Sequence, residues 1–528
     1  MATVVAIPIL AVLSSLAAPA LDVWAHVLRT QMLELVVNTV VLLVGVGVGT
    51  LGLGAFLAWL VVTYRFPGRT IFEWALILPL AIPAYVIGFV VLGLTEFAGP
   101  IQTALREAFG PSARLPEPRS GGGVILVMTL VFYPYVYTLA RAAFLEQSAD
   151  TLEAARSLGR SGLRAFVTVT LPMARPSLAA GLSLALMEAL ADFGTVATFG
   201  YRTFTEAIYR VWHGMFDRLA ATQLAVVLLG FAGLLLWLEH ASRGRARFTQ
   251  HGRHGRASAP IPLEGGKALA ATGACVLVLA LAFGLPVGQL TVWGWRTLAS
   301  QGLPAEFGAQ LRTSLGFATL TAVCAGGMAV VLAYAARLER SRVVAVATRF
   351  AALGYALPGS VIAVGVLLPL AWLDDVTAAV FHGGGATPRA GPILTGSALG
   401  LVLAYLVRFL AVSLQTVGAS LTKIPNTLDE AARSLGARTG RTVRRVHLPL
   451  IRRGVLAALA LVFVEVMKEM PATILLRPFA LNTLAIGVWQ WTAESLWEEA
   501  SVPALAIVAA GLLPVALTMR RISHDAPP

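Results

Sequence analysis

Apolar segments long enough to cross a membrane recur along this 528-residue chain and restrict what it can fold into. A helix of about 20 apolar residues spans a hydrocarbon core of ~30 Å. Lipid cannot hydrogen-bond to backbone N–H and C=O groups, so the spanning segments must satisfy these groups internally, as helices do. Only 13% of the residues are charged, against roughly a quarter in soluble proteins. We therefore predict an all-α polytopic membrane protein with about twelve transmembrane helices. The predicted spans are 3–20, 36–63, 72–95, 122–143, 176–199 and 219–239, then 268–290, 313–336, 349–372, 394–415, 454–476 and 502–519.

The heptapeptide Glu-Ala-Ala-Arg-Ser-Leu-Gly occurs twice, at 153–159 and at 430–436. A capping side chain three residues before each glutamate (Asp150, Thr427) and the closing glycine predict a short helix. A helix of under two turns is unstable alone in water, so each copy needs a partner surface. A Leu-Pro pair follows each copy at the same distance and ends the loop. The predicted docking residues are Glu153, Ala154, Ala155, Gly159, Leu171, Pro172, Glu430, Ala431, Ala432, Gly436, Leu448 and Pro449.

The interval of 277 positions between the copies predicts two related halves, residues 1–240 and 267–528. Gly, Pro and Arg dominate 241–266, which indicates a flexible basic linker. One span of each half has a central proline break, Pro83 and Pro358. An even number of spans separates equivalent points, so the repeats run in the same sense through the membrane. An axis along the membrane normal should relate them, with any pathway on that axis.

The basic residues are concentrated in one set of loops, which holds 27 of the 40 Lys and Arg. The positive-inside rule assigns these loops and both termini to the cytoplasm. We therefore interpret the net charge of +13 as the result of basic residues that fix the topology of the chain, and we expect no nucleic-acid partner. The two cysteines both lie inside spans, which excludes a disulfide framework or a Cys-based metal site. The basic loops are 64–72, 141–175, 240–267, 337–349, 416–453 and 520–528.

The pattern Glu-Ala-Ala-x3-Gly-x9-[Ile/Val]-x-Leu-Pro resembles the signature loop of permease subunits of binding-protein-dependent ABC importers. It occurs at 153–172 and 430–449, with Val169 and Val446 where that family normally has Ile. The resemblance implies two cytoplasmic ATPase subunits docked on the two loops, and a periplasmic binding protein delivering substrate to the bacterial inner membrane. The chain contains no Gly-x-x-x-x-Gly-Lys-[Ser/Thr] motif, so ATP would bind to the partner subunits. We expect a translocation subunit that is not an enzyme and binds no cofactor.

Further stretches at 133–144, 191–196, 204–210 and 468–479 resemble fused two-half ferric-iron uptake permeases. The resemblance implies ferric iron as the transported substrate, while related importers of thiamine, polyamines or oxyanions remain alternatives. An ion-coupled secondary transporter also uses repeats and buried carboxylates, but it has no reason for two identical cytoplasmic cassettes. A membrane-embedded metal enzyme would need a ligand cluster such as His-Glu-x-x-His, which the chain lacks.

The fifth span of each half contains two acids, which are unusual for a lipid environment. A charged side chain costs about 2.5–3.5 kcal/mol at the bilayer centre, so these acids should face the bundle interior. Each pair has i, i+4 spacing and shares one helix face. Two interpretations stay open: the carboxylates line a pathway for a hard cation, which prefers oxygen ligands, or Lys468 pairs with one of them and others cap broken helices. The four acids are Glu188, Asp192, Glu465 and Glu469.

Overall fold

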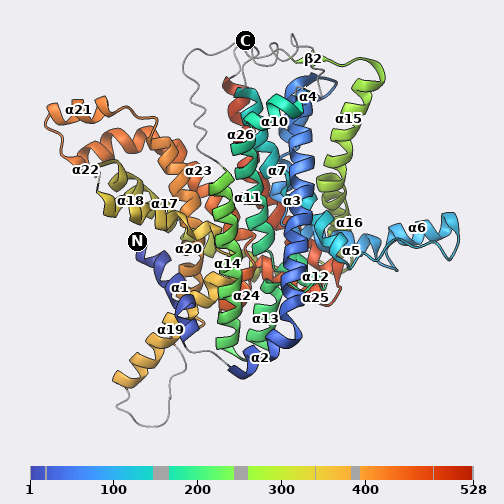
Figure 1. Cartoon of the computed structure of the whole chain (residues 1–528), viewed down its shortest axis with the longest axis horizontal. Helices are drawn as coiled ribbons and strands as arrows, with labels where there is room; N and C mark the ends of the chain where they lie inside the picture. Colours follow the sequence, from blue (N-terminus) through green and yellow to red (C-terminus); the bar gives the residue numbers. More distant parts are fainter. Residues whose placement is uncertain are drawn as a thin grey trace.

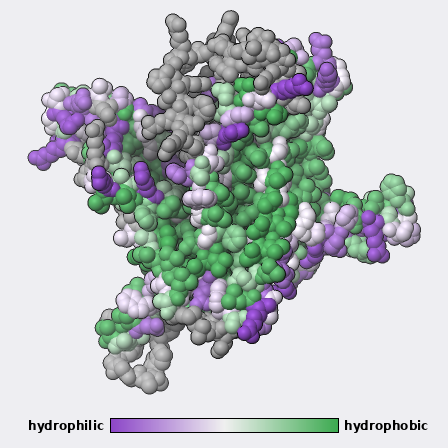
Figure 2. All heavy atoms as spheres, viewed as in Figure 1, coloured by the Kyte–Doolittle hydropathy of each residue, from purple (hydrophilic) through white to green (hydrophobic). Residues whose placement is uncertain are grey.

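The chain folds into a bundle of helices, which a computed structural model describes for residues 2–17, 21–146, 164, 166–242, 260–338, 341–381, 393–479 and 481–525. On the face shown in Figure 2, a broad apolar band lies between two more polar ends, and Figure 1 shows the helices that cross it. In the described part, eight helices are long and apolar enough to cross a membrane, or nine if a bent pair is counted as one span. The all-α membrane class is confirmed, whereas the predicted count of twelve spans is not.

The helices of the first half follow the predicted spans but break inside several of them. Its elements are α1 (Ala2–Ser14), η1 (Ser15–Ala17), α2 (Leu21–Thr30), α3 (Met32–Thr63), β1 (Tyr64–Arg65), α4 (Arg69–Ala75), η2 (Leu78–Ala81), α5 (Ala84–Thr95), α6 (Pro100–Phe109), α7 (Gly121–Glu146), η3 (Phe166–Thr170), α10 (Leu171–Met173), α11 (Arg175–Ala191), α12 (Gly194–Thr198), α13 (Phe204–Gly214) and α14 (Arg218–Ser242).

The second half repeats this order, including the breaks. Its elements are β2 (Ile261–Pro262), α15 (Gly265–Leu279), η4 (Ala280–Gly284), α16 (Leu285–Ser300), α17 (Phe307–Leu338), α18 (Arg342–Ala352), η5 (Gly354–Ala356), α19 (Gly359–Phe381), α20 (Ala398–Leu421), α21 (Asn426–Ser434), α22 (Thr439–Thr442), η6 (Val443–His447), α23 (Leu448–Met467), α24 (Pro471–Leu476), α25 (Leu484–Ala493) and α26 (Trp497–Asp525).

The proline-centred breaks predicted from the sequence are confirmed in both halves. Pro83 has extended backbone and serves as the N-cap of α5, while Pro358 directly precedes α19. A short 3-10 turn lies before each proline, η2 in the first half and η5 in the second. Proline has no N–H and disfavours helical backbone in the residue before it, so the incoming helix ends there.

Glycine lets the core helices of the first half approach closely. A Cβ added at Gly54 of α3 would lie 2.8 Å from the carbonyl oxygen of Tyr133 in α7. A Cβ added at Gly181 of α11 would lie 2.8 Å from the Cα of Val136, also in α7. The backbone of α7 is thus held between two glycines. Such close contact provides van der Waals packing where the hydrophobic effect between helices is absent.

The first helix of each half packs on the other half. In α1, Pro8 lies directly against Gly365 of α19, where an added Cβ would be 2.5 Å from the Pro8 carbonyl oxygen. In α15, the Thr272 hydroxyl donates a 3.0 Å hydrogen bond to the carbonyl of Pro67 in the first half. Cys275 belongs to the same buried cluster as first-half aromatic residues. The two halves therefore exchange their first helices: α1 packs on the second half and α15 on the first. The order of the chain alone would suggest that each of these helices packs on its own half.

The end of the predicted linker is ordered. Strand β2 pairs in parallel with β1, which places Ile261 opposite Tyr64, and Leu263 N–H donates to the Arg65 carbonyl at 2.9 Å. This pairing anchors the start of the second half to the loop before α4. The remainder of the linker, 243–259, lies outside the described residues.

Candidate functional site

Broken helices from both halves meet in the centre of the molecule. α11 ends at Ala191 and α12 begins at Gly194, while α23 ends at Met467 and α24 begins at Pro471. Gly194 lies directly against the Met470 side chain of the other half. The breaks predicted near the fifth-span acids are therefore present in both repeats.

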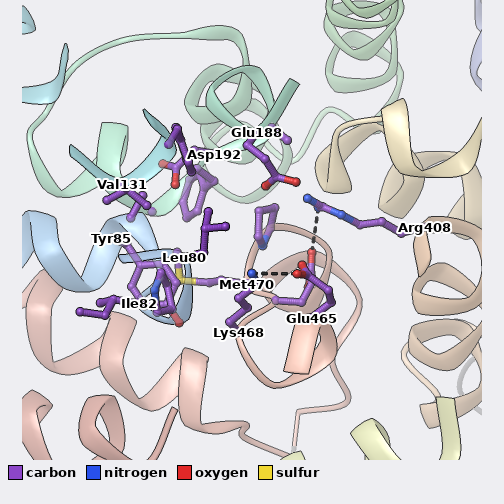
Figure 3. Close-up of a pocket in the computed structure, with 18 of the residues that line it drawn as sticks. Leu80, Ile82, Tyr85, Val131, Glu188, Asp192, Arg408, Glu465, Lys468 and Met470 are labelled. Atoms are coloured by element: carbon purple, nitrogen blue, oxygen red, sulfur yellow. Dashed lines mark hydrogen bonds and ion pairs between the residues drawn. The ribbon is translucent and has the colours of Figure 1, made fainter. Parts of the chain in front are cut away.

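A cavity of about 80 Å³ lies at this meeting point (Figure 3). Residues of both halves line it, and they include the residues that begin α5, α12 and α24. All four acids singled out in the sequence face this space. The polar side chains of the lining are Tyr85, Tyr135, Glu188, Asp192, Arg408, Glu465, Lys468 and Glu469.

Two of the acids cap the short helices beyond the breaks. Asp192 accepts hydrogen bonds from the Thr195 N–H at 2.8 Å and from the Thr195 hydroxyl at 3.1 Å. Glu469 accepts from the Ala472 N–H at 2.9 Å, the Thr473 N–H at 3.1 Å and the Thr473 hydroxyl at 2.6 Å. The first N–H groups of a helix have no partner within the helix, so these carboxylates satisfy α12 and α24. Negative charge is also favoured at a helix N-terminus.

The other polar groups form pairs around the same space. Lys468 Nζ lies 2.9 Å from Glu465, and Arg408 Nη1 lies 3.4 Å from Glu469. Glu188 accepts a 2.7 Å hydrogen bond from the Tyr355 hydroxyl, which joins the two halves. Figure 3 shows the Glu188 carboxylate and the Arg408 guanidinium pointing into one space from opposite halves. The acids thus cap broken helices and form ion pairs, as the structural interpretation predicts. They also line a cavity, which the pathway interpretation requires. A pathway role for the acids stays a prediction.

The second docking element forms the nine-residue helix α21, which stands at one end of the molecule (Figure 1). Glu430 and Ala431 are exposed, and Leu435 is 86% exposed at the end of the helix. Gly436 has a φ of 75°, and the Ala437 N–H bonds to the Ala432 carbonyl at 2.9 Å. Left-handed glycine with this hydrogen bond is the predicted C-cap. The first copy of the cassette, 153–159, lies outside the described residues.

Two expectations for this helix are wrong in detail. The helix begins at Asn426 behind Pro425 without a side-chain cap, so Thr427 lies inside the first turn and does not cap it. Ala432 is only 8% exposed and packs inward, although it is one of the predicted docking residues. Proline needs no N–H partner and starts the helix earlier than the capping pattern suggests. The exposed apolar surface is therefore Leu428, Ala431 and Leu435.

Each Leu-Pro pair starts the next helix. Leu171 and Pro172 open α10, and Leu448 and Pro449 open α23, with the proline in the first two helical positions. A five-residue π-helical turn precedes each pair, η3 in the first half and η6 in the second. The missing N–H of proline costs little in the first turn of an α-helix, which is where each proline lies.

Comparison with known proteins agrees with this architecture. Residues 50–238 and 325–524 each match the family described as the binding-protein-dependent transport system inner membrane component. The chain belongs to this family. It is therefore a permease of ABC importers, whose members are not themselves enzymes and carry no bound cofactor.

Relatives of the permease serve several substrates. The Fe(3+)-transport system permease protein FbpB 2 of Haemophilus influenzae is 30% identical over 493 residues, which cover 93% of this chain and 90% of the relative. The molybdenum transport system permease protein ModB of Escherichia coli is 30% identical over 207 residues, 37% of this chain and 89% of the relative. The sulfate transport system permease protein CysT of Salmonella typhimurium is 30% identical over 189 residues, 35% and 66% of the two chains.

The two repeats of the permease contribute unequally to the cavity. At the cassette interval of 277 positions, Arg408 corresponds to Val131 and Lys468 to Ala191, and all four residues line the cavity. Both cations thus come from the second half, where the first half has apolar side chains. The helix breaks and the acids that cap the following helices are present in both halves. At the aligned positions, the two cations are present in the second half alone.

Sequence reasoning missed Arg408 and Tyr355 as site residues. Arg408 is a basic residue inside the predicted span 394–415, and the cost of an unpaired charge there indicates a buried partner. Its partner Glu469 belongs to another helix, so spacing within one span could not identify the pair. Tyr355 comes from a turn in the other half, and nothing in its local pattern indicates contact with Glu188.

Proposed function

We propose that this permease imports ferric iron. A ferric-iron permease is among the relatives and aligns with 93% of the chain, and four carboxylates line the cavity where the two halves meet. Hard cations prefer oxygen ligands. The cavity supplies carboxylate oxygens from both halves and the hydroxyls of Tyr85 and Tyr135.

An oxyanion is the second candidate, because relatives carry molybdate or sulfate and two cations line the cavity. Arg408 and Lys468, however, already have carboxylate partners. Four carboxylates against two cations leave the cavity negative when all are ionised, and at low effective dielectric such charge repels an anion. The charge balance therefore favours a cation.

Glu188 is the carboxylate best suited to meet a passing cation. It contacts the Tyr355 hydroxyl but, in the described part of the chain, has neither a helix to cap nor an ion-pair partner. The described residues also contain no group of three His, Cys, Asp or Glu side chains arranged to hold a metal. Weak, sequential contacts suit a permease, because a transported ion must leave again.

We also propose that the two cassettes dock on two cytoplasmic ATPase subunits. The exposed Leu435 and Ala431 on a short helix support this role, since an apolar surface of this kind needs a partner. Gly159→Pro combined with Gly436→Pro should uncouple transport from ATP hydrolysis while the chain still inserts. Normal transport by this double variant at wild-type abundance would count against docking through the cassettes.

The opposite end of the molecule is the proposed face for the periplasmic binding protein, with both termini of the chain in the cytoplasm. In the outer segments 200–218 and 477–500, Phe216 is 84% exposed and Phe479 is fully exposed. Phe216 also has a φ of 54°, which is uncommon for a bulky residue. Alkaline phosphatase fused to the C-terminus should be inactive if the terminus is cytoplasmic, and activity would contradict this topology.

Uptake of radiolabelled ferric iron by cells with and without the gene tests the substrate, with thiamine and molybdate as controls. We expect loss of iron uptake alone. Glu188→Gln should then lower iron uptake, whereas Glu107→Gln on the exposed face of α6 should not. Loss of molybdate or thiamine uptake instead would refute iron as the substrate while leaving the importer architecture intact.

A further inference from the structure

An ion-paired cluster ties the docking helix α21 to the membrane helices. Arg337, in the last turn of α17, binds Asp429 of α21 through Nη2 at 2.6 Å and Nε at 3.0 Å. His447, the last residue of η6, places Nε2 2.9 Å from the other Asp429 oxygen. We call Arg337, Asp429 and His447 the docking clamp. One carboxylate thus connects α21 to α17 and to η6, which leads into α23.

The same arginine also closes the end of α20. Arg337 Nη1 donates to the Leu421 carbonyl at 2.8 Å, and Nη2 donates to the Ile424 carbonyl at 3.0 Å. The last carbonyls of a helix lack partners within the helix, and a cation there is favourable. Because a guanidinium is planar with fixed donors, these contacts hold the α20 end and α21 in one geometry.

The docking clamp is protected from solvent. The side chains of Arg337, Asp429 and His447 are 12%, 18% and 1% exposed. Charge-assisted hydrogen bonds of this kind are shorter and stronger than neutral ones, and burial reduces screening by salt. Burial lowers the pKa of His447, and Arg337 lowers it further while Asp429 raises it; the Tyr334 ring lies 5.4 Å away.

The first half has other residue types at the three positions that align with the docking clamp. At the interval that aligns Pro83 with Pro358, Arg337 corresponds to Val62; at the cassette interval, Asp429 corresponds to Leu152 and His447 to Thr170. None of these counterparts is ionisable at neutral pH, so the sequence of the first half does not repeat the docking clamp at the aligned positions. The heptapeptide is repeated identically, whereas the three residues of the docking clamp are not.

We infer that the docking clamp makes the second cassette a rigid lever. Movement of an ATPase subunit at α21 then passes directly to α17, α20 and α23. The first cassette, without these clamp residues, is coupled less tightly to its membrane helices. The inference rests on the proposed ATPase docking. It assigns Arg337, Asp429 and His447 a positioning role, and it predicts that the two ATPase sites are not equivalent although the heptapeptides are identical.

The test uses the complex of the full chain with its ATPase subunit in liposomes. Spin labels at Ser434→Cys in α21 and Val331→Cys in α17, both at exposed positions, report how firmly α21 is held after Cys275 and Cys324 are replaced by Ala. Asp429→Asn should broaden the distance distribution in both nucleotide-free and ATP-bound states. It should also lower the ferric iron imported per ATP by about fivefold, the low end of typical coupling between sites.

A second variant guards against misfolding. The triple substitution Arg337→Val, Asp429→Leu and His447→Thr installs the residue types of the first half and leaves no unpaired buried charge, which makes insertion easier to preserve. It should broaden the distribution as Asp429→Asn does. Lys423→Ala, which removes an exposed cation from the turn before α21, is the matched control and should change neither readout.

The outcomes separate this inference from the proposed function. A narrow distribution and normal import per ATP in the triple variant would overturn the lever. An equal loss of coupling in Leu152→Asn, the first-half counterpart of Asp429→Asn, would overturn the inequality of the two sites. Failure of the wild-type chain to retain an ATPase subunit would instead overturn the proposed docking and the lever together. Spin-label broadening without any iron import by the wild type would support the lever and refute only the substrate.

Discussion

Removing the charge of Glu469 should destabilise the permease far more than removing the charge of Asp192. Both acids cap a short helix beside the cavity, but Glu469 also lies 3.4 Å from Arg408. Glu469→Gln leaves this arginine, only 8% exposed, without its counter-charge. Breaking a buried pair typically costs 3–5 kcal/mol, and the long contact places the expected loss at about 3 kcal/mol.

Asp192→Asn is the matched control in the other half. Asparagine caps a helix about as well as aspartate, and the position that corresponds to Arg408 holds Val131, so no cation is left unpaired. The expected loss is under about 1 kcal/mol. Unfolding by SDS in bicelles, followed by tryptophan fluorescence, gives the free energy of unfolding of both variants.

A double substitution tests the cause of the difference. Combining Glu469→Gln with Arg408→Met removes both charges, so the pair should be less destabilised than the sum of the single variants by at least about 1 kcal/mol. Two outcomes would refute the view that Glu469→Gln destabilises the permease chiefly by leaving Arg408 unpaired. One is an equal loss of unfolding free energy for Glu469→Gln and Asp192→Asn. The other is a double variant whose loss equals the sum of the two single losses.

Three further predictions concern other parts of the chain. Gly54→Ala should lower the free energy of unfolding by about 1–3 kcal/mol through overpacking against α7, while Gly52→Ala, which meets nothing within 4 Å, should not; equal effects would contradict the packing argument. Phe216→Ser with Phe479→Ser should reduce stimulation of ATP hydrolysis by the loaded binding protein, and full stimulation would remove these residues from that interface. Because burial lowers the pKa of His447 below 6.5, the neutral imidazole stabilises the fold above pH 6.5, and this stability is lost as the pH falls through 6.5 toward the lowered folded pKa; the drop in melting temperature on acidification should shrink in His447→Thr, and an unchanged drop would contradict it.

The sequence predicts features that depend on local chemistry. Pro83 and Pro358 mark the helix breaks because proline cannot continue a helix. Gly436 marks the end of α21 because glycine adopts left-handed backbone without strain. The fifth-span acids were expected to avoid lipid because exposed charge is costly there, and they lie on the central cavity.

Features that depend on which helices meet could not be predicted in this way. Lipid-facing and protein-facing sides of a span are both apolar, so hydrophobic periodicity does not show which helix α1 packs on. The contact between Pro8 and Gly365 is therefore invisible in the pattern. The same holds for Arg408 with Glu469, which lie 61 positions apart on separate helices. A charge inside a span indicates that a partner exists without identifying it.

Because the two halves belong to one chain, they can differ in sequence, and they carry different numbers of positive charges at the cavity. Two identical halves would place two copies of Arg408 and Lys468 around the axis and would make the four acids neutral in sum. In the single chain, the first half has Val131 and Ala191 at those positions, so the cavity keeps an excess of carboxylates and Glu188 has no cation partner among the described residues. The docking clamp is likewise present only in the sequence of the second half. The acids of the cavity are thus paired unequally: Glu465 and Glu469 lie within ion-pair distance of Lys468 and Arg408, whereas Glu188 accepts a hydrogen bond from Tyr355. For the proposed cation substrate, unequally paired carboxylates would provide weak contacts, which suit an ion that must leave again.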